Sequence, residues 1–225
     1  TAVRSFLRYL VATGQCPARL KEAIPPVANW RLSALPRYLP PSDIDRILSS
    51  CPTGTPVGLR DRAILLLFCR LGLRAHEVMN LRLGDLDWSE GSLVVAGKGG
   101  RRDRLPLPQE VGDAILAYLK WGRPPTDTDV LFLRARAPRA PFSASTALSG
   151  IARRALRRAQ VKAPTAAAHL FRHSAATEML RQGSSLEAIA QILRHRSLET
   201  TAHYAKVDLV LLREIAQPWP EVPPC

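Results

Sequence analysis

The chain has 225 residues, which is enough for one well-buried domain with a small appendage. Its net charge of +13 and pI of about 10.6 indicate a polyanionic partner, either nucleic acid or an anionic membrane surface. No run approaches the roughly 18 apolar residues of a membrane span, no signal peptide is visible, and the four cysteines form no C-x-x-C pair. We therefore expect neither a zinc nor a disulfide framework, and a reduced, cytoplasmic setting.

The first 41 residues predict a helix followed by a linker. Apolar residues recur at helical spacing over 4–13, and Gly14 follows as a stop signal. The proline-rich segment 16–41 is typical of an extended linker. Because the chain starts at Thr1 and not at Met, we expect a trimmed fragment or missing first residues.

The next segment predicts three helices. Ser42 is a suitable N-cap residue, and Asp43 and Asp45 follow in the first turn of a helix that ends near Cys51. A longer helix is predicted over 57–72, with a buried apolar segment from Ala63 to Cys69. A short helix follows over 75–81.

Short strands are then predicted over 83–88, 92–96 and 104–107, with a glycine-rich hairpin turn at 97–103 between the last two. The remaining pattern is helical, apart from a loop at 123–141 with a buried piece at 130–133 and an irregular tail at 217–225. The predicted helices span 109–121, 143–160, 170–182, 185–193, 197–205 and 207–216. The fold class is mainly α with a small antiparallel β-sheet (α+β).

Four places carry residue types suited to chemistry: Arg74 between two helices, Lys98 in the hairpin, His169 to His173 at a helix start, and His195 followed by Tyr204. Each has an ordinary explanation, since a single arginine can be solvated and a single tyrosine can belong to a core. The two histidines at i, i+4 could ligate a metal. However, no acidic residue lies between them as in H-E-x-x-H, and no third ligand is near, so we expect no metal site.

In this order and spacing, the four places resemble the tyrosine recombinase (phage integrase) family over about residues 38–215. The segment Gly72-Leu73-Arg74 to Glu77-Val78, with Leu81 and Asp85-Leu86-Asp87, resembles the box of the first arginine. Gly97-Lys98-Gly99 resembles the lysine hairpin. His169-x-x-Arg172-His173-Ser174-x-Ala176-Thr177 resembles the histidine–arginine box, and Leu193-x-His195 with Thr200, Thr201 and Tyr204 resembles the final box.

The resemblance implies a catalytic-domain fold that cleaves and rejoins DNA through a 3′-phosphotyrosyl intermediate. Arg74 and Arg172 would clamp the phosphate oxygens bidentately, with His195 as a further donor. Tyr204 would be the nucleophile and His169 its base. Lys98 would protonate the leaving 5′-oxygen, which an arginine cannot do because it stays protonated.

Supporting roles are also implied. Glu77 would orient Arg74 or a neighbouring catalytic side chain, and His173 would stand beside the catalytic set. The exchange of one phosphoester for another conserves bond energy, so neither ATP, a metal nor any other cofactor is expected. DNA contacts are expected from three sets of arginines. These are Arg101 and Arg102 in the hairpin, Arg153, Arg154, Arg157 and Arg158 on a predicted helix, and Arg194 and Arg196 beside His195. A solvated helix face is the alternative for the four helical arginines.

One departure from the family pattern is visible. Family members usually have glycine before the final-box histidine and serine after it, whereas this chain has Arg194 and Arg196. The change adds charge beside the site and bears on local loop geometry more than on activity.

The resemblance further divides the chain into domains. Residues 1–35 would be the end of an N-terminal core-binding helical domain plus its linker, 36–217 the catalytic domain, and 218–225 a tail. We expect double-stranded DNA as partner, a homo-tetramer on DNA through the helix 207–216, no membrane, and a nucleoid-associated place in a bacterium. The activity would serve integration, excision or transposition of a mobile element.

Three rival functions remain. A type IB topoisomerase uses a similar residue set but relaxes supercoils as a monomer. A non-catalytic DNA-binding protein could keep the fold, although the intact set of six residues argues against it. A basic RNA-binding module would explain the charge but not the ordered boxes, and stacking aromatics are sparse at 6%.

Overall fold

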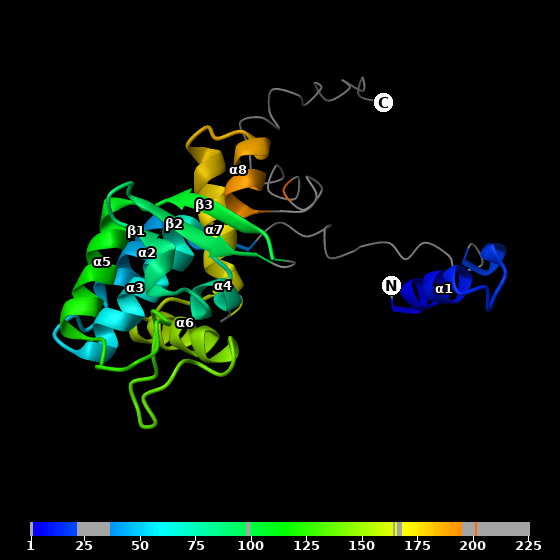
Figure 1. Ribbon diagram of the computed structural model, residues 1–225. Coiled ribbons are helices and arrows are strands. Elements are labelled where there is room, and N and C mark those ends of the chain that lie inside the picture. Colours follow the sequence, from blue (N-terminus) through cyan, green and yellow to red (C-terminus); the bar gives the residue numbers. More distant parts are fainter. Residues whose placement is uncertain are drawn as a thin grey trace, which may run out of the picture. The chain divides into compact units, whose positions relative to one another are not determined.

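The computed structural model describes residues 2–21, 37–97, 100–163, 165, 168–194 and 201. The chain divides into two compact units, Thr1–Ala34 and Leu35–Cys225. Figure 1 shows the elements of both units, coloured along the sequence. None of the helices in the described part is long and apolar enough to span a bilayer.

The first unit contains α1 (Ala2–Ala12) and a 3₁₀ turn, η1 (Ala18–Lys21). The predicted helix 4–13 is therefore confirmed. Its apolar side chains recur every third residue, yet Val3, Phe6 and Tyr9 are each about 60% exposed. No residue of α1 is buried, so this helix presents an apolar stripe that the described residues do not cover.

The second unit is built around α3 (Pro56–Leu71). Ala63 to Phe68 are fully buried on every side, which explains why their sequence shows no helical alternation. α3 packs mainly against α5 and α7, and the rings of Phe68 and Phe171 stack at 6.4 Å between centroids. The other helices of the unit are α2 (Pro41–Ser49), α4 (Ala75–Met79), α5 (Gln109–Trp121), α6 (Thr146–Arg158), α7 (Ala168–Arg181) and α8 (Leu186–Leu193).

Both ends of α3 follow from local chemistry. At its start, the Thr55 hydroxyl accepts a hydrogen bond from the Gly58 N–H at 3.1 Å, and Pro56 occupies the first turn. At its end, Gly72 adopts a left-handed conformation with φ 57°. A side chain at Gly72 would also come within 2.6 Å of the Leu193 side chain on α8. Gly72 therefore both stops α3 and allows α8 to approach.

We expect Gly72→Ala to destabilise the second unit for two separate reasons. The left-handed backbone costs an alanine about 1–2 kcal/mol, and overpacking against Leu193 adds ~1–3 kcal/mol. Gly183→Ala is the matched control, because Gly183 has φ 85° but open space around its Cα. Urea denaturation should show the larger loss for Gly72→Ala. Equal losses would contradict the close approach of Leu193.

A three-stranded antiparallel sheet, in the order β1-β2-β3, completes the unit. Its strands are β1 (Leu86–Asp87), β2 (Ser92–Ala96) and β3 (Arg102–Pro106). Leu93 pairs with Leu105, and both side chains join the core together with Val95. The sheet thus buries the face that carries Leu93, Val95 and Leu105 against the helices.

The fold class predicted from the sequence, mainly α with a small antiparallel sheet, is confirmed. The first predicted strand is partly wrong, because a 3₁₀ turn, η3 (Leu83–Asp85), takes up its first half. The Asp85 carboxylate accepts the Arg82 N–H at 2.9 Å and closes this turn. The predicted helices 197–205 and 207–216 lie outside the described residues, except that Thr201 is helical and buried.

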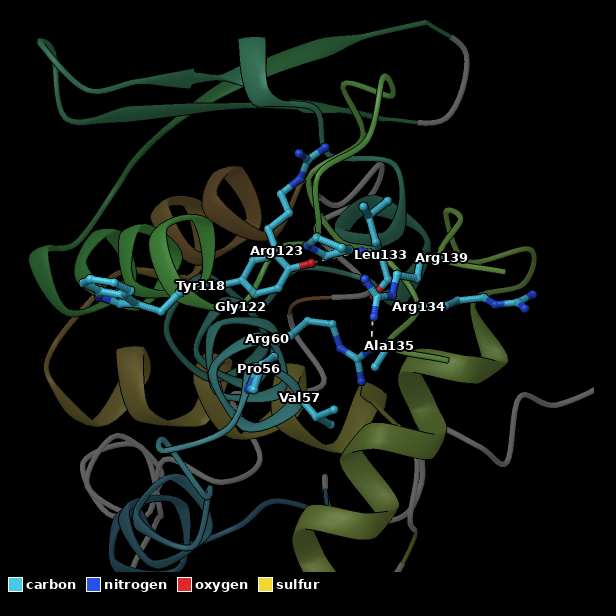
Figure 2. Close-up of a pocket in the computed structure, with 12 residues that line it drawn as sticks. Pro56, Val57, Arg60, Tyr118, Gly122, Arg123, Leu133, Arg134, Ala135 and Arg139 are labelled. Carbon is cyan, nitrogen blue, oxygen red and sulfur yellow. Dashed lines mark hydrogen bonds between the residues drawn. The ribbon is translucent and has the colours of Figure 1, made fainter. Parts of the chain in front are cut away.

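The predicted loop 123–141 lines one side of an open cavity of about 390 Å³, whose other side is formed by the start of α3 and the end of α5 (Figure 2). Arg123 donates to the carbonyls of Thr128, Val130 and Leu131, and Arg60 donates to Asp61 and to the Leu133 carbonyl. These arginines therefore hold the loop and its buried piece in place. The cavity lies at the start of α3, whereas Arg74 follows its end, roughly 24 Å away along a 16-residue helix.

Candidate active site

Both predicted catalytic arginines, Arg74 and Arg172, lie at the end of α3. Arg74 is the N-cap residue of α4, two residues after Gly72 ends α3, and its side chain is 47% exposed. Arg172 is buried in α7. Its Nη1 donates to the Gly72 carbonyl at 2.5 Å, and its Nη2 donates to the Leu193 carbonyl. Arg172 thus joins the end of α3 to the end of α8.

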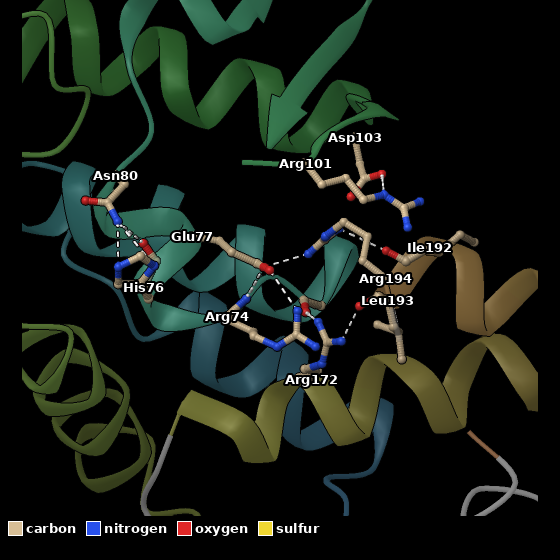
Figure 3. A network of polar contacts seen from close by, with 11 residues as sticks. Arg74, His76, Glu77, Asn80, Arg101, Asp103, Arg172, Ile192, Leu193 and Arg194 are labelled. Atoms are coloured by element: carbon tan, nitrogen blue, oxygen red, sulfur yellow. Dashed lines mark hydrogen bonds and ion pairs between the residues drawn. The ribbon is translucent and has the colours of Figure 1, made fainter. Parts of the chain in front are cut away.

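Glu77 is the centre of a polar network around Arg74 (Figure 3). Its Oε1 accepts from Arg74 Nη1 at 2.8 Å, and its Oε2 accepts from the Arg74 main-chain N–H at 2.7 Å. Oε2 also accepts from Arg194 Nη2 at 2.6 Å. The expectation that Glu77 orients Arg74 agrees with this geometry, since one carboxylate fixes both the backbone and the guanidinium of Arg74.

The charges in the network keep Glu77 ionised. Burial alone would raise the pKa of Glu77, whose side chain is 5% exposed. The positive charge of Arg194 and the N–H groups of Arg74 outweigh burial, so the pKa of Glu77 lies below its usual range. Glu77 is therefore a carboxylate acceptor at neutral pH.

His169 and His173 lie one turn apart at the start of α7. Their rings meet edge to face with centroids 5.3 Å apart, and His169 is exposed. Partial desolvation and then the charge of Arg172 hold the pKa of His169 below its usual value. His169 is therefore mainly neutral at pH 7, which is the form that can accept a proton. Among the described residues, no group of three or more potential metal ligands gathers here or elsewhere.

Arg194 differs from the expectation of a DNA contact. It caps the end of α8 with φ 55° and ψ 48°, and its side chain is only 4% exposed. The guanidinium points back to Glu77 instead of to solvent, because a buried charge needs a charged partner. In the sequence, the only sign that the Arg194 side chain would point inward is that an arginine occupies a position where family members usually have glycine.

The other predicted DNA contacts that the structure describes are exposed. Arg101 and Arg102 lie at the hairpin and pair with Asp103 at 2.6 Å and Asp85 at 2.8 Å. The exposed side of α6, opposite its buried apolar stripe, carries Arg153, Arg154, Arg157 and Arg158. Of these four, Arg158 also donates to Ser50 Oγ and Cys51 Sγ.

Four predicted site residues, Lys98, His195, Arg196 and Tyr204, lie outside the described residues. Sequence reasoning missed two other parts of the site. The acceptors of Arg172 are main-chain carbonyls, at Gly72 and Leu193, which leave no trace in a residue pattern. The Ser174 hydroxyl, in turn, accepts from the Leu39 N–H at 2.7 Å and holds the segment before α2 against α7.

Comparisons with known proteins identify relatives of the chain. The phage integrase family model matches residues 37–209. The protein y4rA of Sinorhizobium fredii is 48% identical over 220 residues, which cover 98% of this chain and 54% of y4rA, so the chain spans about half the length of that relative. Tyrosine recombinase XerC of Pelobacter propionicus is 36% identical over 224 residues, covering 95% of this chain and 69% of XerC.

Solved structures share the fold. The crystal structure of XerA recombinase matches with a TM-score of 0.69 at 27% identity, over 89% of this chain and 67% of XerA. The XerH recombinase, solved with palindromic difH substrate as a post-cleavage complex, matches with a TM-score of 0.70 at 23% identity, over 81% of this chain and 53% of XerH. Because the family model and the XerC similarity both cover most of its length, the chain belongs to the phage integrase family of tyrosine recombinases.

Proposed function

We propose that this chain carries the strand-cleaving chemistry of a site-specific recombinase. In that chemistry the protein attaches covalently to the cut DNA strand through a 3′-phosphotyrosyl bond. The observation that supports this most strongly is the bond from Arg172 to the Gly72 carbonyl, which brings it within two residues of Arg74 along the backbone although the two boxes are about 100 residues apart. Family membership and the fold of XerA support the same assignment.

The two arginines suit a phosphodiester in its transition state. Charge gathers on the non-bridging phosphate oxygens as the nucleophile attacks, and fixed guanidinium groups stabilise it without reorganising. Arg74 is held by Glu77, and Arg172 is held by two main-chain carbonyls, so both charges are placed before DNA arrives. His195 would add a further donor to the same oxygens.

The cleavage step balances with three further residues. The Tyr204 oxygen forms a bond to phosphorus as the bond from phosphorus to the 5′-oxygen breaks. His169 takes the phenol proton, which its lowered pKa permits, and Lys98 gives a proton to the departing 5′-oxygen. One phosphoester replaces another, so the reverse step rejoins the strands, and ATP, metal or another cofactor has no role in either step. His173 stays beside His169 and supports its ring.

Double-stranded DNA is the proposed substrate. XerH was solved bound to palindromic difH substrate, and the Tn1549 transposon integrase in complex with circular intermediate DNA. We propose that four copies assemble on DNA through the segment 207–216, and that the activity moves a mobile element by integration, excision or transposition in a bacterial nucleoid. The domain division at residue 35, with a catalytic part over 36–217 and a short tail after it, belongs to the same proposal.

The exposed arginines of α6 are proposed to meet DNA phosphates, with the hairpin arginines Arg101 and Arg102 and the flanking Arg196. Arg153→Gln with Arg157→Gln should weaken DNA binding and reduce the slope of log affinity against log salt by about 0.9 for each phosphate that is no longer neutralised. Arg134→Gln with Arg139→Gln removes equal charge from the cavity lining, outside α6, and is the control. Fluorescence anisotropy across a salt series measures both. Equal losses of affinity and of salt slope in the two double variants would mean that only the net charge of the protein matters, and that α6 does not contact DNA.

Covalent trapping tests the function itself. Duplexes tiled across the DNA that flanks the gene, each with a nick near every candidate cleavage point, lose a short fragment after cleavage and so prevent religation. A protein–DNA adduct that survives SDS and disappears with protease is the expected result. If no tile yields an adduct, the proposed function is wrong.

A further inference from the structure

Arg194 occupies a backbone position that disfavours a side chain. Its φ of 55° and ψ of 48° lie in the left-handed region, and family members usually have glycine here. Gln160 is the other non-glycine residue with positive φ in the described part of the chain, at φ 53°. Gln160 is exposed, whereas the Arg194 side chain is buried, so Arg194 combines an unfavourable backbone with a buried charge.

The contacts of Arg194 explain what the side chain does there. Nη2 donates to Glu77 Oε2 at 2.6 Å, and Nη1 donates to the Ile192 carbonyl at 2.9 Å within its own helix end. Glu77 belongs to α4 and Arg194 follows α8, so this ion pair joins two elements 117 residues apart in sequence. Both side chains are about 95% buried, which strengthens their interaction compared with an exposed pair.

The same carboxylate holds Arg74. Glu77 Oε1 receives the Arg74 guanidinium, and Oε2 receives both the Arg74 main-chain N–H and Arg194. The Glu77 carboxylate therefore binds the guanidinium of the half-exposed Arg74 through Oε1 and that of the buried Arg194 through Oε2. Without Arg194, the carboxylate would keep Arg74 as its ionic partner but would no longer be fixed from the opposite side.

We propose that Arg194 is a positioning residue that fixes Glu77, and through it the guanidinium of Arg74, against the end of α8. Arg194 thereby couples the first-arginine box to the segment that continues into His195. This inference rests on the proposed function for its effect on cleavage. The buried ion pair with Glu77 offsets the cost of the left-handed backbone at Arg194.

The electrostatic consequence can be measured. The charged groups drawn around Glu77 are Arg74, Arg172, Arg194, and Arg101 with Asp103, while His76 lies on the same helix as Glu77 (Figure 3). Removing Arg194 removes a charge that lowers the pKa of Glu77, so that pKa should rise. Protonated Glu77 no longer orients Arg74. As the pH is lowered, cleavage by the variant without Arg194 should therefore be lost at a higher pH than cleavage by the wild type.

The test compares Arg194→Gly with Gln160→Gly, because both relieve a left-handed backbone and only the first removes a partner of Glu77. With single-turnover adduct formation on the trapping duplex, Arg194→Gly should be about 10- to 100-fold slower. The acid side of its pH profile should move to higher pH. His169 titrates in every variant, so the difference between the profiles reports Glu77. Gln160→Gly should match the wild type, and Arg194→Lys, which keeps charge but not the planar fork, should lie between.

Wild-type rates and an unmoved pH profile in Arg194→Gly would overturn the proposal. A slower rate that is equal at every pH, with a lower melting temperature, would also overturn it by showing a purely structural role. Carboxyl NMR of protein labelled at glutamate decides the contact without DNA, since Glu77 should titrate at higher pH in Arg194→Gly. If the wild type forms no adduct, the proposed function fails, and the NMR titration still supports or refutes the Arg194 contact.

Discussion

Tyr204→Phe should abolish the covalent protein–DNA adduct on the trapping duplex. The phenol oxygen is the atom that bonds to phosphorus, and phenylalanine keeps the ring while lacking that atom. The arginine clamp of Arg74 and Arg172 is untouched, so the affinity for the duplex should stay within a few-fold of wild type. SDS gel electrophoresis of the adduct and anisotropy of the same duplex measure the two quantities.

The control for this variant is Tyr9→Phe. Tyr9 is 61% exposed on α1, in the other compact unit, and the substitution makes the same chemical change. Adduct formation by Tyr9→Phe should equal that of the wild type. Adduct in the Tyr204→Phe sample would exclude Tyr204 as nucleophile, even if the protein proved to be an active recombinase.

Lys98→Arg should slow cleavage by about 10²- to 10⁴-fold, the usual contribution of a general acid. Arginine retains the positive charge and the reach of lysine but does not release its proton near neutral pH. A deoxyribose 5′-oxygen is strongly basic and leaves poorly without a proton. Single-turnover cleavage of the nicked duplex gives the rate.

Replacing the scissile 5′-oxygen by sulfur should restore the rate of Lys98→Arg to near the wild-type value, because a thiolate leaves without protonation. Lys120→Arg is the control, since Lys120 lies over the Trp121 ring at the end of α5 with its ammonium 4.7 Å from the ring centroid. It should cleave both substrates normally. A Lys98→Arg enzyme that stays slow with the sulfur substrate would assign lysine a binding role and not proton donation.

Much of the fold was predictable from local patterns. The helix over 109–121 and the strand over 92–96 match the structure residue for residue. In both, the apolar spacing and the flanking turn residues agree with the final packing. The segment 83–88 has short-strand character in sequence, but only its second half pairs as a strand. The Arg82 N–H donates to the Asp85 carboxylate and favours a turn over 83–85, and this local bond cannot be seen in the order of apolar residues.

The site shows the same division. The box patterns single out Arg74, Glu77 and Arg172. The structure pairs Arg74 with Glu77, and it bonds Arg172 to the main-chain carbonyls of Gly72 and Leu193. What the pattern could not predict is where long side chains point. Arg194 was expected at DNA because of its charge, yet tertiary packing brings Glu77 within 2.6 Å and buries both. The carbonyl acceptors of Arg172 depend on backbone positions in three helices, which no single segment encodes.

Chemical identification of the protein–DNA bond tests the mechanism most directly. The trapped adduct is digested with trypsin and nuclease, and the nucleotide-bearing peptide is sequenced by mass spectrometry. We expect a 3′-nucleotide phosphate on Tyr204, and a released strand whose 5′-hydroxyl is phosphorylated by polynucleotide kinase without prior phosphatase. A nucleotide on any other residue, or a 5′-phosphate bond that leaves a free 3′-hydroxyl, would contradict the 3′-phosphotyrosyl mechanism.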